Sequence, residues 1–283
     1  MVKLQPLRDS SRRHPARFVA KPSPLNKSII PSTYALGLLL GFAILLLLPA
    51  GALAQQFPGR AGETPNTADK FVVSVRDLKI PLQARDAFLE ANRRLARNDF
   101  SGGVYLLRRA IAKFPDYYEA YFLLGIAEIS TDHQADAETA FRKAIVLSAG
   151  ARYAQPYFAL GLLLCDQKHF TEAVETIQAG LDLDGDDWSG HFGMGRALLG
   201  LDRLEDAEKS VRRSIAVRAD LREGYLLLAD IHARQNDQSA VLQDLDDYIA
   251  LDPDEAMRNR VRSVRDDIQR SLSLQSNATA AEN

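Results

Sequence analysis

The chain has little cysteine and no excess of basic residues. Cys165 is the single cysteine among 283 residues, so no intrachain disulfide can form and the fold must be stable without one. The formal net charge is -2, and residues 1–54 carry +6, which leaves -8 for the rest of the chain. This acidic body argues against nucleic-acid binding, which needs clustered lysine and arginine. We therefore expect no nucleic-acid partner.

The sequence also lacks the usual signatures of catalysis. No Walker loop, Gly-x-Ser-x-Gly motif or Rossmann fingerprint occurs. None of the five histidines has a helical partner at metal-binding spacing, and no histidine is placed to activate Cys165. The acidic run at residues 182–188 lacks the acid spacing and terminal glutamate of a calcium loop. We therefore expect no enzymatic activity, no catalytic or metal site and no cofactor.

One long apolar run stands near the amino terminus. Residues 1–34 form a basic leader, and residues 35–54 contain no charge and are long enough to cross a bilayer. One interpretation is a signal peptide cleaved after Ala54, which would give a periplasmic protein. The other is an uncleaved signal anchor in the inner membrane. Both interpretations place the rest of the chain outside the cytoplasm.

Residues 55–83 are expected to link this segment to the folded body. Residues 55–69 are rich in glycine, proline and small polar residues, which is typical of a flexible tether. The β-branched pattern of residues 71–81 predicts a short extended segment that ends at Pro81.

The body contains five related blocks that lie 34 to 36 residues apart. The block at residues 157–165, YFALGLLLC, shows the pattern most clearly, with a small residue at its centre. The central small residues are Ala91, Gly125, Gly161, Gly195 and Ala229. A second block follows each one after a polar break, with apolar residues spaced by four and three, which places them on one helical face. Each unit is therefore predicted to be a helix, a tight turn and a second helix.

This 34-residue pair of helices resembles the tetratricopeptide repeat. The resemblance covers five units, at residues 84–117, 118–151, 154–187, 188–221 and 222–255. It implies an all-α fold, an α-solenoid preceded by one apolar helix. The small residues allow the paired helices to approach closely, and we expect Gly161 to lie opposite Ala173 and Gly180. The end units depart from the pattern, with Glu90 in the first and Tyr248 in the fifth.

The pattern changes after residue 255. Residues 256–274 have one apolar stripe and predict a helix that caps the last unit. The stripe consists of Met257, Val261, Val264, Ile268 and Leu272. Residues 275–283 are expected to form a disordered tail.

Stacked helix pairs form a curved array whose first helices line the concave side. The candidate partner-binding residues on this side are Phe88, Asn92, Phe122, Ile126, Phe158, Leu162, Phe192, Arg196, Leu226 and Asp230. The four phenylalanines form a ladder that either binds a partner or packs between neighbouring first helices. Family members that clamp carboxylate tails use lysine, asparagine and arginine here, and only Asn92 matches, so we expect a hydrophobic peptide or helix instead.

These features predict a non-enzymatic scaffold of the bacterial cell envelope that binds a protein partner in its concave groove. The membrane would be a second partner if the apolar segment is uncleaved, and self-association is a further hypothesis. An alternative is an accessory factor in cell-wall or outer-membrane assembly that binds glycan or lipid. An enzyme with an unrecognised site is the other alternative.

Overall fold

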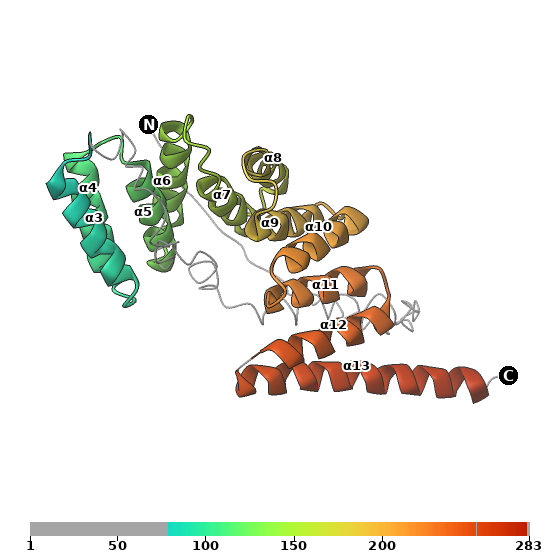
Figure 1. Cartoon of the computed structure of the whole chain (residues 1–283). Helices are drawn as coiled ribbons and strands as arrows, with labels where there is room; N and C mark the ends of the chain where they lie inside the picture. Colours follow the sequence, from blue (N-terminus) through green and yellow to red (C-terminus); the bar gives the residue numbers. More distant parts are fainter. Residues whose placement is uncertain (1–78, 253, 282–283) are drawn as a thin grey trace, which may run out of the picture.

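The computed structural model describes residues 79–252 and 254–281, in which the chain forms α-helices and no strand (Figure 1). The helices are α3 (Leu82–Leu95), α4 (Phe100–Lys113), α5 (Tyr118–Ser130), α6 (Gln134–Leu147), α7 (Gln155–Asp166), α8 (Phe170–Leu181), α9 (Trp188–Gly200), α10 (Leu204–Val217), α11 (Arg222–Arg234), α12 (Gln238–Leu251) and α13 (Glu255–Ala281). In this part of the chain no helix combines the length and apolar character that a membrane span requires. The predicted leader, the apolar segment and nearly all of the linker lie outside the described residues.

The helices pack as five consecutive antiparallel pairs, from α3 with α4 to α11 with α12 (Figure 1). The first helix of each pair also contacts the second helix of the preceding pair, so the pairs stack in chain order. The predicted α-solenoid of five units is therefore confirmed. The largest apolar cluster runs from α5 to α11 because each first helix has neighbours on two sides, and separate clusters lie at the first pair and where the last pair meets α13.

Every turn inside a pair ends the first helix in the same way. One residue has a positive φ of 58° to 63°, and the next residue donates its N–H to a carbonyl five residues back. In the third unit, for example, Lys168 has φ 63° and His169 donates to the Leu164 carbonyl at 2.8 Å. This is the Schellman termination, which satisfies carbonyls that the helix end leaves unpaired. The left-handed residues are Asn98, Asp132, Lys168, Asp202 and Asn236.

Small residues allow the two helices of a unit to cross closely. A Cβ atom at Gly161 would overlap the side chain of Ile177 and would lie 3.6 Å from the Ala173 carbonyl. The expected contact with Ala173 is therefore present. The expected contact with Gly180 is wrong, because Gly180 faces Phe158 one turn further along α8. The same close contact between a glycine on the first helix and an apolar side chain on the second occurs in two other units, at Gly125 with Phe141 and at Gly195 with Val211.

Two residues, Arg152 and Tyr153, separate the second unit from the third, and both contact neighbouring units. Arg152 has φ 48° and donates from Nη2 to the Leu183 carbonyl at 2.9 Å. The Tyr153 ring packs against Tyr118 and Phe122, with ring centroids 5.1 and 5.6 Å apart. Burial raises the pKa of the Tyr153 hydroxyl, which stays neutral in this apolar position.

Helix α13 covers the open side of the last unit. Val261 and Ile268 are buried against α12, and Met257, Val264 and Leu272 pack around them, as the apolar stripe predicts. Tyr248 fits where other units have a small residue because its ring enters this cluster. The predicted end of the helix at residue 274 is wrong, since α13 continues to Ala281. Extending an existing helix needs no new nucleus, and alanine is the best helix former.

Candidate functional site

The predicted phenylalanine ladder lies mostly inside the protein. Phe158, Leu162, Phe192 and Leu226 have at most 2% of their surface exposed. Phe122 and Ile126 are also buried, and Phe88 in the first unit is half-buried. The side chains that were expected to present an apolar groove therefore belong largely to the core.

Each phenylalanine packs where its unit meets the next one. The Phe88 ring lies 4.8 Å from that of Tyr117, which directly precedes the second unit. Phe158 occupies the space left by Gly180 and Gly190, because a Cβ atom on either glycine would come within 2.6 Å of its ring. Phe192 belongs to a small cluster with Leu162 and with Leu221, the residue before α11. The ladder thus joins successive units.

The polar groove candidates also bind within the chain. Arg196 Nη2 lies 2.6 Å from Asp166 Oδ1, which connects the fourth unit to the third. Asp230 accepts a hydrogen bond from Arg234 at 3.3 Å, and burial raises the pKa of the Asp230 carboxyl. Arg234 also donates to the Leu199 carbonyl of the neighbouring first helix at 3.4 Å.

Of the two interpretations of the ladder, packing between helices accounts for its burial. Phe88, Asn92 and Arg196 are half-buried, and the other seven candidates are buried. Contact between any of these ten residues and a partner stays a prediction.

One histidine is buried among acidic side chains at the junction of the last two units. His232 Nδ1 lies 2.5 Å from Asp244 Oδ2, and Nε2 lies 3.5 Å from Glu208 Oε1. Burial raises the pKa of the Asp244 carboxyl to about 6, although the nearby histidine opposes the change. These three residues come from α11, α12 and α10, so the contacts tie three helices together. The burial of His232 and Asp244 favours a structural role over contact with a substrate.

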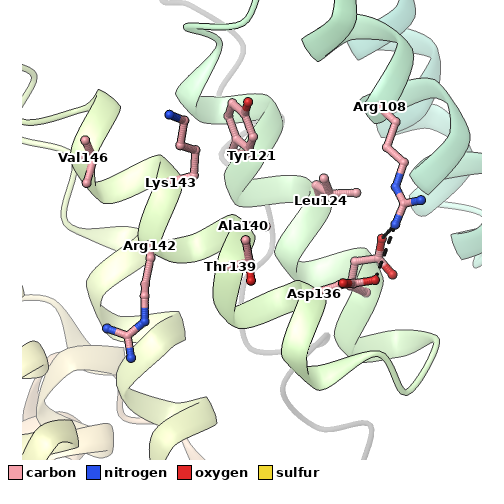
Figure 2. A pocket seen from close by; sticks show the side chains of 10 residues that line it. Arg108, Tyr121, Leu124, Asp136, Thr139, Ala140, Arg142, Lys143 and Val146 are labelled. Atoms are coloured by element: carbon pink, nitrogen blue, oxygen red, sulfur yellow. Dashed lines mark hydrogen bonds and ion pairs between the residues drawn. The ribbon is translucent and has the colours of Figure 1, made fainter.

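The structure also shows a cleft that the sequence did not predict. It has a volume of about 630 Å³ and is formed by α4, α5 and α6 (Figure 2). Tyr121 and Leu124 of α5 form an apolar floor, and α6 lines one side from Asp136 to Val146. Arg108 of α4 lies at the opposite side (Figure 2). We call this feature the α4–α6 cleft.

The two ends of the α4–α6 cleft differ in charge. At one end Arg108 lies 2.7 Å from Glu128, which is buried, and 3.6 Å from Asp136. Arg142 is also compensated, since it pairs with Glu138 and with Glu172 of the next unit. Lys143 has no ion pair with any residue of the described chain, and in Figure 2 it lies beside Tyr121.

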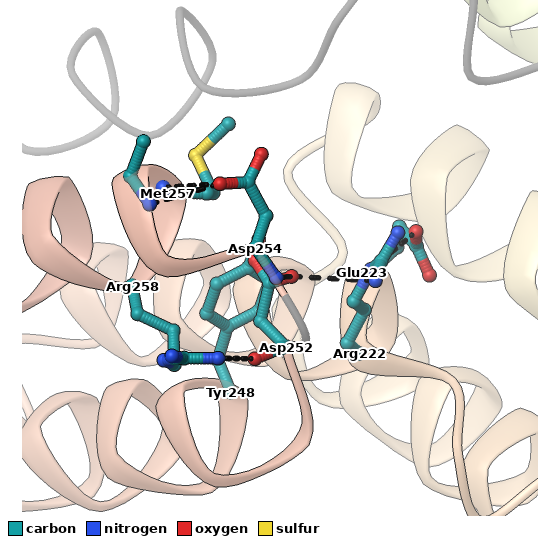
Figure 3. A network of polar contacts seen from close by, with 8 residues as sticks. Arg222, Glu223, Tyr248, Asp252, Asp254, Met257 and Arg258 are labelled. Atoms are coloured by element: carbon teal, nitrogen blue, oxygen red, sulfur yellow. Dashed lines mark hydrogen bonds and ion pairs between the residues drawn. The ribbon is translucent and has the colours of Figure 1, made fainter.

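A network of polar contacts fastens α13 to the last unit (Figure 3). Asp252 is buried and accepts a hydrogen bond from the Tyr248 hydroxyl at 2.5 Å and from Arg222 at 3.3 Å. Arg258 of α13 donates to the Asp252 carbonyl at 2.7 Å. Burial, together with the hydrogen bond to Asp252, raises the pKa of the Tyr248 hydroxyl. The network is a structural joint between α11, α12 and α13.

The sequence contains one feature that is consistent with the α4–α6 cleft but does not predict it. Lys143 and Val146 stand on α6, whose neighbouring residues Thr139 and Ala140 are small. Small residues on a wall leave space, but the sequence does not show whether a neighbouring unit fills it.

Comparison with known proteins agrees with this architecture. No curated protein matches the chain in sequence. MamA (residues 41 to the end) from Desulfovibrio magneticus RS-1 superposes with a TM-score of 0.53 and 17% identity, covering 61% of this chain and 96% of that one. The tetratricopeptide protein TTC0263 from Thermus thermophilus gives 0.54 and 17%, covering 64% and 97%.

PilW, described as a widely conserved type IV pilus biogenesis factor, gives a TM-score of 0.55 at 14% identity, covering 60% of this chain and 78% of that one. At these identities the likeness concerns the fold alone. The tetratricopeptide repeat model matches residues 88–155, 158–220 and 192–256, which together exceed half of the chain. The chain belongs to the tetratricopeptide repeat family.

Proposed function

We propose that this protein is a non-enzymatic scaffold of the bacterial cell envelope that binds a protein partner on its repeat array. The observation that carries the proposal is the array itself, five stacked helix pairs held by close crossings and capped by α13. Such an array offers an extended surface on a rigid frame, which suits the binding of a peptide or helix.

The concave groove is one candidate surface for this partner. Its buried phenylalanines would shape the groove, while Asn92 and the partly exposed Arg196 would contact the partner. The placement outside the cytoplasm is supported by the basic leader and by the uncharged run at residues 35–54. Cleavage after Ala54 and retention as a membrane anchor are alternative forms of the same proposal.

Site-specific photo-cross-linking in the native envelope tests the scaffold function. A benzoylphenylalanine would replace Asn92 on the concave side, and others would replace the exposed Tyr105 and Leu201. We expect one defined protein to be captured from at least one site. The control also carries Gly125→Leu, Gly161→Leu and Gly195→Leu together, which overpack three helix crossings and should unfold the array, and capture should then be lost. Equal capture in the control would contradict a function of the folded array.

Protease treatment of spheroplasts tests the placement separately. An added protease should digest the repeat array without lysis if the array lies outside the cytoplasmic membrane. Complete protection before lysis, followed by digestion after it, would contradict the envelope proposal. Mass spectrometry of the mature amino terminus then distinguishes cleavage after Ala54 from retention of the apolar segment.

A further inference from the structure

We propose that the α4–α6 cleft is a docking site for an acidic segment of a partner protein that carries apolar side chains on one face. This inference rests on the proposed scaffold function, to which it adds a defined site and the chemistry of the partner. The cleft lies on a different side of α5 from the concave candidates Phe122 and Ile126, so the two surfaces can be tested independently.

The first argument is an apolar residue that the repeat leaves uncovered. Leu124 occupies the place that holds Leu160, Met194 and Leu228 in the next three units, and those three side chains are buried. Leu124 is only half-buried, and it lies in the floor of the cleft beside Tyr121. At the rim, Val146 is 68% exposed. Apolar side chains gathered around one cleft, rather than scattered singly over the surface, favour an interaction site there.

The second argument is the length of the cleft. Its lining on α6 runs from Asp136 to Val146, which corresponds to about 15 Å along a helix. The same distance is spanned by about three turns of a partner helix. Apolar residues spaced by three or four on such a helix would lie over Tyr121, Leu124 and Val146. An elongated, apolar-floored cleft on the surface therefore fits a segment of polypeptide.

The third argument is charge. The lining residues carry three positive and two negative side chains, and both negative ones pair with Arg108. Lys143 is left without an ion pair in the described chain, directly beside the apolar floor. A carboxylate on the partner would compensate it, so an acidic segment is favoured over a basic one. Helix α13 of a second copy is too basic to be this acidic segment, because residues 256–281 carry five arginines and two aspartates.

The test measures peptide binding by fluorescence polarisation with the full chain in phospholipid nanodiscs, which avoid free detergent in the cleft. Three labelled 14-residue helical peptides share one leucine stripe and differ only in having glutamate, glutamine or lysine on their flanks. A fourth peptide has the acidic composition in scrambled order. The protein variants are Thr139→Trp, which fills the cleft from a position at its wall, and Lys143→Glu. Lys209→Glu changes a lysine on α10, away from the cleft, and serves as the matched control.

We expect the acidic peptide to bind at least tenfold more tightly than the lysine peptide and the scrambled one. Thr139→Trp should weaken this binding at least tenfold, Lys143→Glu should reverse the preference between acidic and lysine peptides, and Lys209→Glu should change neither. Circular dichroism melting confirms that each variant is folded. The proposal is overturned if no peptide binds, if the flanking charge has no effect, or if Thr139→Trp binds like the wild type.

Light scattering on the same samples addresses a second copy as the occupant. A dimer that Thr139→Trp dissociates would overturn the proposal in favour of self-association. If the cleft proposal fails, the scaffold function can still hold, because cross-linking from Asn92 or Leu201 would then still capture a partner. Loss of capture from every site would instead refute the scaffold function itself.

Discussion

Lys168 should be replaceable by asparagine with a gain in stability. It is one of five residues that end a first helix in the left-handed conformation, and the other four are asparagine or aspartate. Lysine has no short polar group to stabilise this conformation, which costs an ordinary residue about 1–2 kcal/mol. The termination depends on backbone hydrogen bonds from Lys168 and His169, which asparagine would keep.

The expected gain for Lys168→Asn is about 0.5–1 kcal/mol, since asparagine recovers only part of the strain. For a folded array of this size, a gain of that amount raises Tm by about 1–4 °C. Differential scanning calorimetry measures the shift. Lys168→Ala is the matched control, because it removes the same charge and keeps the strained conformation. Equal Tm values for the two variants, or no gain for Lys168→Asn, would refute the argument from backbone strain.

Three further changes test other parts of the structure. Gly161→Leu would collide with Ile177 and should lower stability by about 1–3 kcal/mol, measured by thermal melting, whereas an unchanged Tm would contradict the observed crossing. The pKa of Asp244 is raised to about 6, so its contribution to stability is present at low pH and is lost as the pH rises through about 6. Urea midpoints at several pH values should therefore show the wild type falling relative to Asp244→Asn, and parallel curves would contradict this. Asp252→Ala removes the acceptor for Tyr248, for Arg222 and for the Asp254 N–H just before α13, so hydrogen exchange in α13 should accelerate while α3 and α4 stay unchanged. Uniform acceleration across the array would argue against a local joint.

The repeat period explains how much of the fold was predictable. Small residues at constant offsets specify a pair of helices, because only short side chains allow the close crossing seen between Gly161 and Ile177. The apolar stripe after residue 255 likewise specified a helix that packs on α12. These features depend on local spacing, which one sequence contains in full. The length of α13 was harder to predict, because its last turns carry no apolar stripe to indicate a helix.

The candidate surfaces were harder to predict because exposure depends on neighbouring units. Helical spacing placed Phe158 on a second face of its helix, but it could not show that two glycines leave room for the ring. The same limitation applies to the α4–α6 cleft. Leu124 has the character of a core residue, and only the arrangement of α4 and α6 around it leaves it partly uncovered. Sequence spacing thus identifies faces of a helix, and packing decides which faces remain accessible.

The contact of Phe158 with Gly180 and Gly190 has a consequence for evolution and engineering. The three residues span two units, since Gly190 belongs to α9, and any side chain at either glycine would meet the phenylalanine ring. They should therefore change together among related sequences. At the preceding junction Pro156 stands at the place equivalent to Gly190, so a copy of the third unit moved there would bring its phenylalanine against the proline. The repeats look interchangeable in sequence, but each is fitted to the neighbour that follows it.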